Sequence, residues 1–272
     1  MLGGYLDFLW LFLLGGVVIA ITRFLLIQGI QWASDAWEIP RKVQGQILGY
    51  ATSAPELVGT LGTASKGLIG AGLWNVAASN IINLLLFTSA ALYYKRSKML
   101  VQRKFIDEAG FALGAIAIPC LLVLNEDFAR SPYAAGGLFL YFVSYLVLDK
   151  VFNPKEEEDD DTDGGVDTKQ GAKGIAFIVL GLLGIIITGN FLGTVAESIV
   201  TQLHVPEWAV GWILGVITSL PELTSFYAVF AASKASEDDE DCQQNLDNLA
   251  ASNMSNVGLI YPLGILVFLL VT

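Results

Sequence analysis

The chain has little of what most enzymes and zinc proteins use for their chemistry. Its 272 residues include one histidine, His204, and two cysteines, Cys120 and Cys242, which lie far apart and have no metal-ligand spacing. His204 is too isolated for a metal site or a catalytic triad, no candidate nucleophile lies beside a base, and no nucleotide-binding loop is present. We therefore predict that the protein is not an enzyme, uses no cofactor, is not driven by ATP and keeps both cysteines as free thiols.

Charge is also scarce. Only 15% of the residues are charged, 54% are hydrophobic and the mean hydropathy is +0.59, which is too apolar for a soluble domain. The net charge of −11 arises mainly from two hydrophilic stretches, residues 156–167 and 237–247. Neither has the spacing of a calcium-binding EF-hand, so both are interpreted as solvated linkers. The composition predicts an all-α integral membrane protein that contacts the lipid bilayer and binds no nucleic acid.

Apolar runs of about 20 residues, enough to cross a bilayer, occur eight times. The first begins almost at Met1 and runs past Gln28, and because no short basic leader with a cleavage site precedes it, we expect it to remain in the mature protein. The first and sixth runs are unusually long, which indicates a strong tilt or an extension beyond the hydrocarbon. The predicted spans are residues 5–34, 43–65, 70–94, 105–125, 133–151, 173–203, 208–232 and 247–270.

The distribution of lysine and arginine orients these spans. If successive loops alternate between the two sides of the membrane, only Lys66 and Arg130 fall on the side that carries both termini, and Arg23 lies within the first span. Short loops rich in lysine and arginine stay in the cytoplasm, so both termini are predicted to face outward. The residues predicted on the cytoplasmic side are Arg41, Lys42, Lys95, Arg96, Lys98, Arg103, Lys104, Lys150, Lys155, Lys169, Lys173 and Lys234.

One polar sequence occurs twice within apolar runs. Residues 52–57 read Thr-Ser-Ala-Pro-Glu-Leu and residues 218–223 read Thr-Ser-Leu-Pro-Glu-Leu, a shift of 166 residues. A second block, residues 75–83, matches residues 248–256. An odd number of spans separates the starts of the two copies, so the copies enter the membrane in opposite directions. That is an inverted repeat, from which secondary transporters build a site near the middle of the membrane.

The repeat divides the chain into three predicted parts. Residues 1–152 form the first copy with five spans, residues 153–172 form an acidic cytoplasmic linker, and residues 173–272 form the second copy with three spans. Four helices, two from each copy, are expected to meet at one centre.

The repeated glutamates, Glu56 and Glu222, are the strongest functional signal. An ionised carboxylate inside the membrane is costly and persists only with a partner, of which a cation is the simplest; a protonated glutamate bonded to neighbouring hydroxyls is the alternative. Proline has no amide proton, so Pro55 and Pro221 should each open the helix beside the glutamate and free a backbone carbonyl. Broken backbone at membrane depth is tolerated where it is buried in protein or lines a cavity. These residues therefore predict broken helices at an ion site.

Hydroxyl and amide side chains recur at helical spacing. Thr52 lies four residues before Glu56 with Ser53 beside it, and the second copy has Thr218 and Ser219 in the same places. The same spacing joins a serine to an asparagine in each copy of the second block, namely Ser79 to Asn83 and Ser252 to Asn256. The hydroxyls could instead bond back to preceding carbonyls and bend their helices. Oxygen ligands with carboxylates suit hard cations, calcium better than magnesium, and sodium accepts similar oxygens.

The two motifs resemble the alpha repeats of the calcium/cation antiporter superfamily, particularly its prokaryotic sodium/calcium exchanger branch, in which G-T-S-x-P-E-L is followed by G-S-N-x-x-N. Both motifs occur in both halves in this order, so the resemblance covers almost the whole chain. It implies a core of four spans with broken helices, across which the first and sixth spans slide as gates. The ion-site residues are then Glu56, Glu222, Thr52, Ser53, Thr218, Ser219, Ser79, Asn83, Ser252 and Asn256, completed by backbone at Gly49 and Gly215.

The chain departs from this family pattern at several positions. The glycine before T-S is Ala51 or Ile217, and the glycine of G-S-N is Ala78 or Ala251. Many members have an aspartate where Asn256 stands, so the site keeps two carboxylates, which argues against a potassium-coupled mode. Typical members have ten spans, two more than are predicted here. Because those two lie outside the ion core in the family, transport is expected to survive, while stability or dimerisation could differ.

The function that the resemblance implies is exchange of Na⁺ for Ca²⁺ by alternating access, normally extruding Ca²⁺ across a prokaryotic plasma membrane. The two ions would be substrates that compete for one site. The proton-coupled branch has a G-N-x-x-E pattern, so T-S-x-P-E favours sodium over protons. The alternatives are an H⁺/Ca²⁺ exchanger and a non-transporting membrane subunit that binds Ca²⁺, and the sequence leaves the oligomeric state open.

Overall fold

The computed structural model describes residues 2–96, 106–152, 167–232 and 240–272, and the regular structure within these ranges is helical. π-Helical segments, Thr22–Ile27 and Asn256–Ile260, join α1 to α2 and α12 to α13. The helices are α1 (Leu2–Ile21), α2 (Gln28–Ala36), α3 (Arg41–Thr52), α4 (Ala54–Ala64), α5 (Ile69–Tyr93), α6 (Ile106–Leu122), α7 (Glu126–Ala129), α8 (Pro132–Phe152), α9 (Thr168–Leu203), α10 (Glu207–Thr218), α11 (Leu220–Ala232), α12 (Glu240–Ser255) and α13 (Tyr261–Val271).

All eight predicted spans are helical, which confirms the all-α prediction. By length and composition, 6 helices of the described chain are able to cross a membrane, where continuous helices such as α1–α2 count as one. The other two predicted spans are α6, which is shorter, and the pair α3 and α4, which is interrupted at Ser53. Of the predicted linker 153–172, residues 153–166 lie outside the described residues.

The prediction of a hydrophilic loop over residues 237–247 is wrong from Glu240 onward, because α12 begins there. Cys242, Leu246 and Leu249 recur every three or four residues and are buried against Phe226 and Phe230 of α11. This apolar stripe is typical of an amphipathic helix, and the acidic side chains between its members obscure it in the sequence.

Large apolar side chains cover the outside of the molecule. Phe24, on the π-helical segment after α1, is 65% exposed, and Leu140 on α8 and Ile186 on α9 are 65% and 60% exposed. A soluble protein would not leave long helices coated in this way, whereas hydrocarbon tails solvate such surfaces well. The chain is an integral membrane protein.

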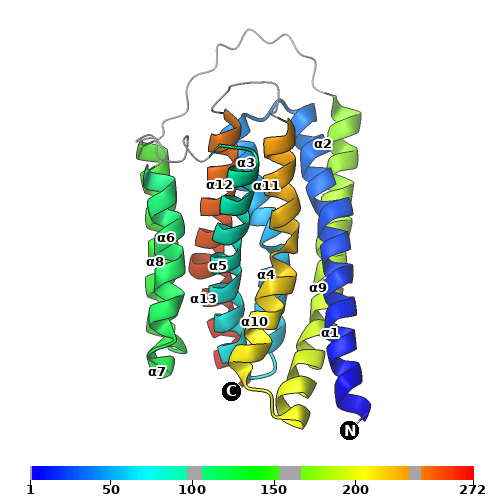
Figure 1. Cartoon of the computed structure of the whole chain (residues 1–272), viewed down its shortest axis with the longest axis vertical. Helices are drawn as coiled ribbons and strands as arrows, with labels where there is room; N and C mark the ends of the chain where they lie inside the picture. The colour runs from blue at the N-terminus through cyan, green and yellow to red at the C-terminus, as the bar shows by residue number, and fades with distance from the viewer. Residues whose placement is uncertain (1, 97–105, 153–166, 233–239) are drawn as a thin grey trace.

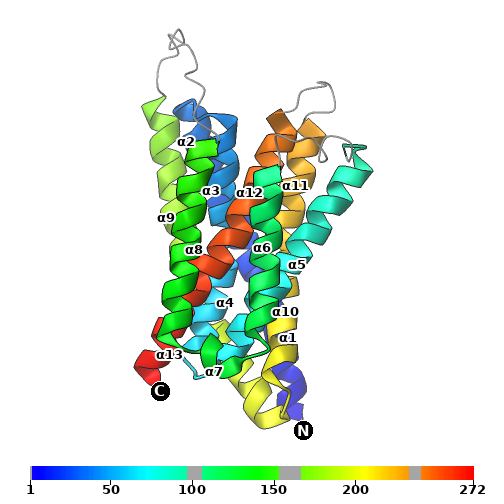
Figure 2. The same cartoon turned by 90° about the vertical axis from the view of Figure 1, so that its left-hand side faces the viewer.

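The two copies of the repeat run in opposite directions. Figures 1 and 2 place α3 and α11 toward one end of the molecule and α4 and α10 toward the other, with both termini at the latter end. The half-helix before the motif thus lies at one end of the molecule in the first copy and at the opposite end in the second copy. This confirms the predicted inverted repeat and the predicted location of both termini on one side.

Pairs of glycines interlock the two copies. Gly45 and Gly49 on α3 contact α12 of the second copy, and Gly211 and Gly215 on α10 contact α5 of the first. A Cβ atom added to Gly45 would lie 2.5 Å from the carbonyl oxygen of Gln244. Small residues four apart let helix backbones touch inside a membrane, where van der Waals packing replaces the hydrophobic effect. Each half-helix that carries a motif therefore packs on the other copy.

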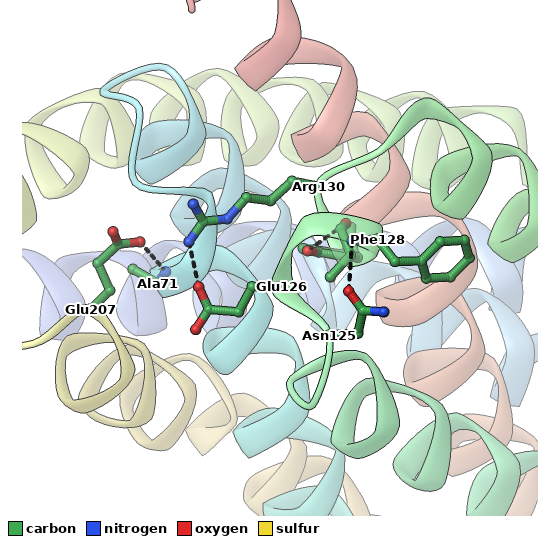
Figure 3. A network of polar contacts seen from close by, with 8 residues as sticks. Ala71, Asn125, Glu126, Phe128, Arg130 and Glu207 are labelled. Carbon is green, nitrogen blue, oxygen red and sulfur yellow. Dashed lines mark hydrogen bonds and ion pairs between the residues drawn. The ribbon is translucent and has the colours of Figure 1, made fainter.

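A polar network joins the two copies at the end that holds the termini (Figure 3). Glu207 Oε2, in the first turn of α10, accepts a hydrogen bond of 3.0 Å from the Ala71 amide in the first turn of α5. Nearby, Arg130 forms an ion pair of 2.8 Å with Glu126. The first amides of a helix have no partner within the helix, so the Glu207 carboxylate satisfies one of them and fixes α10 to α5.

Gly45→Ala is expected to destabilise the protein by about 1–3 kcal/mol, because its Cβ would force α3 away from α12. Gly136→Ala on α8 is the matched control, since a Cβ there meets no atom within 4 Å. The higher helix propensity of alanine should make the control neutral or stabilising by up to about 1 kcal/mol. Thermal unfolding of both variants in one detergent measures the difference, and equal melting temperatures would contradict the proposed packing.

Candidate functional site

Both repeated motifs interrupt their helices at the same residue. α3 ends at Thr52 and α4 begins at Ala54, with Ser53 between them at φ −81° and ψ −1°; Ser219 has the same angles between α10 and α11. This confirms the helix breaks predicted from the two prolines. Glu56 and Glu222 lie in the first turns of α4 and α11. The positive end of a helix dipole therefore lies near each carboxylate.

Glu56 is completely buried and is linked to the second copy through a shared serine hydroxyl. Its Oε1 accepts a hydrogen bond of 3.1 Å from Ser79 Oγ on α5. Ser79 Oγ also lies 3.3 Å from Thr218 Oγ1 and 3.4 Å from the Gly215 carbonyl oxygen, both on α10. A glutamate of one copy thus shares a hydroxyl with the motif of the other.

Glu222, also completely buried, has the corresponding arrangement in reverse. Its Oε1 accepts a hydrogen bond of 3.3 Å from Ser252 Oγ on α12. Ser252 Oγ lies 2.9 Å from Ser53 Oγ and accepts a hydrogen bond of 3.1 Å from Asn83 Nδ2 on α5. Ser79 and Asn83 are one turn apart, about 6 Å along α5, so the networks of the two glutamates meet at this helix.

Several oxygens at this centre are buried and have no hydrogen-bond partner within the described ranges. They are Glu56 Oε2, Glu222 Oε2, Ser219 Oγ, Asn83 Oδ1 and Asn256 Oδ1. Buried polar atoms are almost always satisfied, so a group of unsatisfied oxygens around two carboxylates indicates a missing positive partner. Carboxylate, hydroxyl and amide oxygens are the ligands of hard cations such as Ca²⁺ and Na⁺. The residues present fit such an ion.

The remaining predicted ligands lie within the same networks. Thr52 Oγ1 and Ser53 Oγ donate hydrogen bonds of 3.3 and 2.9 Å to the Gly49 carbonyl oxygen of the preceding turn. This is the bonding to preceding carbonyls that the sequence allows as the alternative to ion ligation. The Gly215 carbonyl oxygen accepts a hydrogen bond of 3.1 Å from the Ser219 amide. The carbonyl oxygens of Gly49 and Gly215 therefore accept hydrogen bonds within the two motifs, and their role as ion ligands stays a prediction.

Asn80 and Asn253 cross-link α5 and α12 beside the centre. Asn80 Nδ2 donates to the Asn253 carbonyl oxygen at 3.2 Å, and Asn253 Nδ2 donates to the Asn80 carbonyl oxygen at 3.3 Å. Asn75, which was not predicted as a site residue, donates from Nδ2 to the Glu56 carbonyl oxygen at 3.3 Å and to Thr60 Oγ1 at 3.1 Å. Its place at the start of the second block was the only signal that could have identified it.

A second carboxylate group escaped the sequence reasoning because its members are far apart in the chain. Glu108, Asp149 and Asp247 offer oxygens that all lie within 4.8 Å of one another. Gln46 donates to Asp149 at 2.8 Å, and Gln243 donates to Glu108 at 2.8 Å and to Asp247 at 3.1 Å. These contacts attach α6 and α8 to the core helices α3 and α12.

Comparisons with known proteins agree with this geometry. A family described as "Sodium/calcium exchanger protein" matches residues 8–150 and 173–270. A relative from Alkalimonas amylolytica, named as an antiporter, CaxA, is 26% identical over 232 residues, which is 81% of this chain and 68% of that protein.

Solved structures of a sodium-calcium exchanger, NCX_Mj, share the fold. The structure soaked with 2.5 mM Na⁺ and 10 mM Sr²⁺ has a TM-score of 0.55 at 21% identity, over 97% of this chain and 83% of the other. The structure soaked with 100 mM Na⁺ and 10 mM Sr²⁺ has a TM-score of 0.56 at 20% identity with the same coverage. The similarity therefore extends over nearly the whole described chain.

Calcium is expected to raise the melting temperature of the parent protein in detergent, because a ligand at about 100 times its Kd stabilises the folded state by roughly 2.7 kcal/mol. Glu56→Gln and Glu222→Gln should each lose most of this gain, since each removes a charged oxygen from the centre. Glu126→Gln is the matched control, because Glu126 lies at the surface in its pair with Arg130. Equal calcium-induced shifts in all four proteins would contradict the assignment of the centre.

Proposed function

Since the chain belongs to the sodium/calcium exchanger protein family, we propose that it exchanges Na⁺ for Ca²⁺ at the centre formed around Glu56 and Glu222. The observation that carries the proposal is the set of buried, unsatisfied oxygens on Glu56, Glu222, Ser219, Asn83 and Asn256. These come from four helices of the two copies, so an ion held by them contacts both halves of the protein at once.

The charge of the centre accounts for coupling between the two ions. Two carboxylates carry about −2, which one Ca²⁺ balances; two Na⁺ balance it equally, and three leave about +1. Occupancy by Ca²⁺ and by Na⁺ is then mutually exclusive, and an empty, doubly charged centre does not reorient easily across the membrane. Exchange needs no further device, and an inward sodium gradient drives Ca²⁺ out of the cytoplasm.

The gates in this proposal are α1 with α2, and α9. They lie side by side along one face of the molecule, opposite α6 and α8 (Figure 1). α9 contacts the core through glycine, since a Cβ on Gly193 would lie 2.6 Å from the Gly62 carbonyl oxygen, and Lys66 pairs with Glu197 at 3.4 Å. Smooth backbone contacts of this kind favour sliding of one helix past another.

The two gates differ in backbone conformation although they are related by the repeat. Thr22 begins a π-helical segment and its hydroxyl has no hydrogen-bond partner in the part of the chain that is described, whereas Thr188 lies in continuous α-helix and donates to the Gly184 carbonyl oxygen at 2.8 Å. In alternating access by an inverted repeat, each copy takes in turn the conformation of the other. Unequal gates are the arrangement that such a cycle requires in any one state.

The orientation follows from charge. We assign the basic loops to the cytoplasm, both termini to the outside and the protein to a prokaryotic plasma membrane. The first copy is residues 1–152, the linker 153–172 and the second copy 173–272. The ligands in this assignment are Glu56, Glu222, Thr52, Ser53, Thr218, Ser219, Ser79, Asn83, Ser252 and Asn256, with backbone at Gly49 and Gly215.

The experiment is ⁴⁵Ca²⁺ uptake into proteoliposomes loaded with sodium and diluted into sodium-free buffer. The parent and Glu126→Gln should accumulate calcium, and Glu56→Gln and Glu222→Gln should each lower the initial rate by roughly tenfold or more, because loss of even a supporting group at a metal site costs about 10–100-fold. Unchanged uptake in both glutamine variants would reject the site.

The same vesicles separate the alternatives. Uptake driven by a proton gradient without sodium would identify an H⁺/Ca²⁺ exchanger. Binding of calcium by the purified protein, without uptake under either gradient, would identify a non-transporting subunit.

A further inference from the structure

Asn80, near the middle of α5, is completely buried, and its amide can take only one orientation. Its Nδ2 donates to the Ala115 carbonyl oxygen at 2.8 Å and to the Asn253 carbonyl oxygen at 3.2 Å. A carbonyl oxygen only accepts hydrogen bonds, so turning the amide over would place oxygen against oxygen. Asn80 Oδ1 must therefore face away from these carbonyls, toward Asn256, whose Nδ2 donates to it at 2.8 Å.

The Ala115 carbonyl is available because of a proline in α6. In a regular helix it would accept the amide proton of the residue four positions later, but that residue is Pro119, which has none. α6 packs against both α5 and α12, so the free carbonyl reaches the crossing of these two core helices. A helix outside the ion centre thus fixes the orientation of a side chain beside it.

We propose that Asn80 is the positioning residue that turns the Asn256 amide so that its oxygen faces the cation, and that requires a hydrogen-bond donor at position 256. This inference rests on the proposed function and specifies the charge of its site. Asn256 Nδ2 donates to Asn80 Oδ1, which leaves Asn256 Oδ1 buried and without a partner in the described chain. The oxygen is thereby reserved for an ion.

The consequence is that the centre admits two carboxylates and excludes a third. An ionised aspartate at position 256 would face Asn80 Oδ1 with an oxygen that cannot donate, and Asn80 cannot turn because of the carbonyls of Ala115 and Asn253. A protonated aspartic acid could donate to Asn80 Oδ1, but it would add no negative charge to the centre. Two acceptors in contact inside the protein repel and lose their hydrogen bonds. An added negative ligand should then weaken calcium binding, whereas simple charge attraction predicts that it would strengthen it.

The repeat supplies a matched control at Asn83, the counterpart of Asn256. Asn83 Nδ2 donates to Asn253 Oδ1 at 3.2 Å and to Ser252 Oγ at 3.1 Å. The serine hydroxyl can rotate and donate to an aspartate at position 83. Asn253 Nδ2 donates to the Asn80 carbonyl oxygen at 3.3 Å, one long hydrogen bond where Asn80 Nδ2 makes two. An aspartate at position 83 therefore adds the same charge to the same centre against a less firmly held acceptor, and it has the Ser252 hydroxyl as a donor.

The test is calorimetric titration of the purified full chain with CaCl₂ in detergent. Asn256→Asp should lower the calcium affinity by roughly tenfold or more relative to Asn83→Asp, the loss expected for an unsatisfied buried acceptor at a charged group. Equal affinities of the two variants, or tighter binding by Asn256→Asp, would overturn the inference. Failure of the parent to bind calcium would instead overturn the proposed function, so the two failures are distinct.

A double-mutant cycle with Asn80→Ala separates positioning from a merely structural role. Removing the Asn80 oxygen should make Asn256→Asp cost less than about threefold in that background, because no acceptor then faces the aspartate. Additive losses would overturn the inference. If Asn256→Asp gives no folded protein, Asn80→Ala alone decides, because it removes no oxygen assigned to the ion: weaker calcium binding supports the positioning role, and unchanged affinity contradicts it.

Discussion

The structure depends on holding two glutamates inside a membrane protein with only half of their oxygens satisfied. Each carboxylate has one oxygen bonded by a serine and one that is buried without a partner among the described residues. Such a centre is unfavourable by itself, because buried charge must be compensated. For the proposed ion binding, the surrounding helices must keep the centre open to an ion and prevent the two glutamates from finding other partners.

The fold meets this demand by interlocking its two copies. Each motif helix packs through glycines on the long polar helix of the other copy, α3 on α12 and α10 on α5. Consequently the Ser79 hydroxyl donates to Glu56 and also contacts the Thr218 hydroxyl of the other copy. The Ser252 hydroxyl likewise donates to Glu222 and contacts the Ser53 hydroxyl of the other copy. Each serine hydroxyl that donates to a carboxylate also contacts a hydroxyl of the other copy. Each glutamate thus takes its hydrogen bond from its own copy, while the same serine links it to the other copy, so the complete centre forms only when the copies are paired.

The sequence predicted most of this because the relevant signals are local. Pro55, Pro221 and the duplicated glutamates lie within six residues of each helix break, and the 166-residue shift reveals the pairing of the copies. What it did not predict depends on contacts between distant residues. The start of α12 at Glu240 is stabilised by Cys242 and Leu246 packing on α11, and the group of Glu108, Asp149 and Asp247 forms only when three helices meet. Spacing along the chain carries no trace of the carboxylate group, and the apolar stripe of α12 is obscured by the acidic residues between its members.

Departures from repeat symmetry are as informative as the symmetry itself. An alternating-access protein must keep its two end states within a few kcal/mol, so any element that differs between the copies shifts the balance between them. A π-helical segment joins α1 to α2, whereas α9 is continuous α-helix. The Ser53 hydroxyl is hydrogen-bonded, whereas the Ser219 hydroxyl has no partner among the described residues. Asn80 donates to the Ala115 carbonyl oxygen of α6, a contact that Asn253 does not make in the described chain. All three differences lie at the centre or on a proposed gate. In the proposed exchange cycle, the duplicated motif would supply a site that works in both directions, and these unequal neighbours would determine which direction is favoured when no ion is bound.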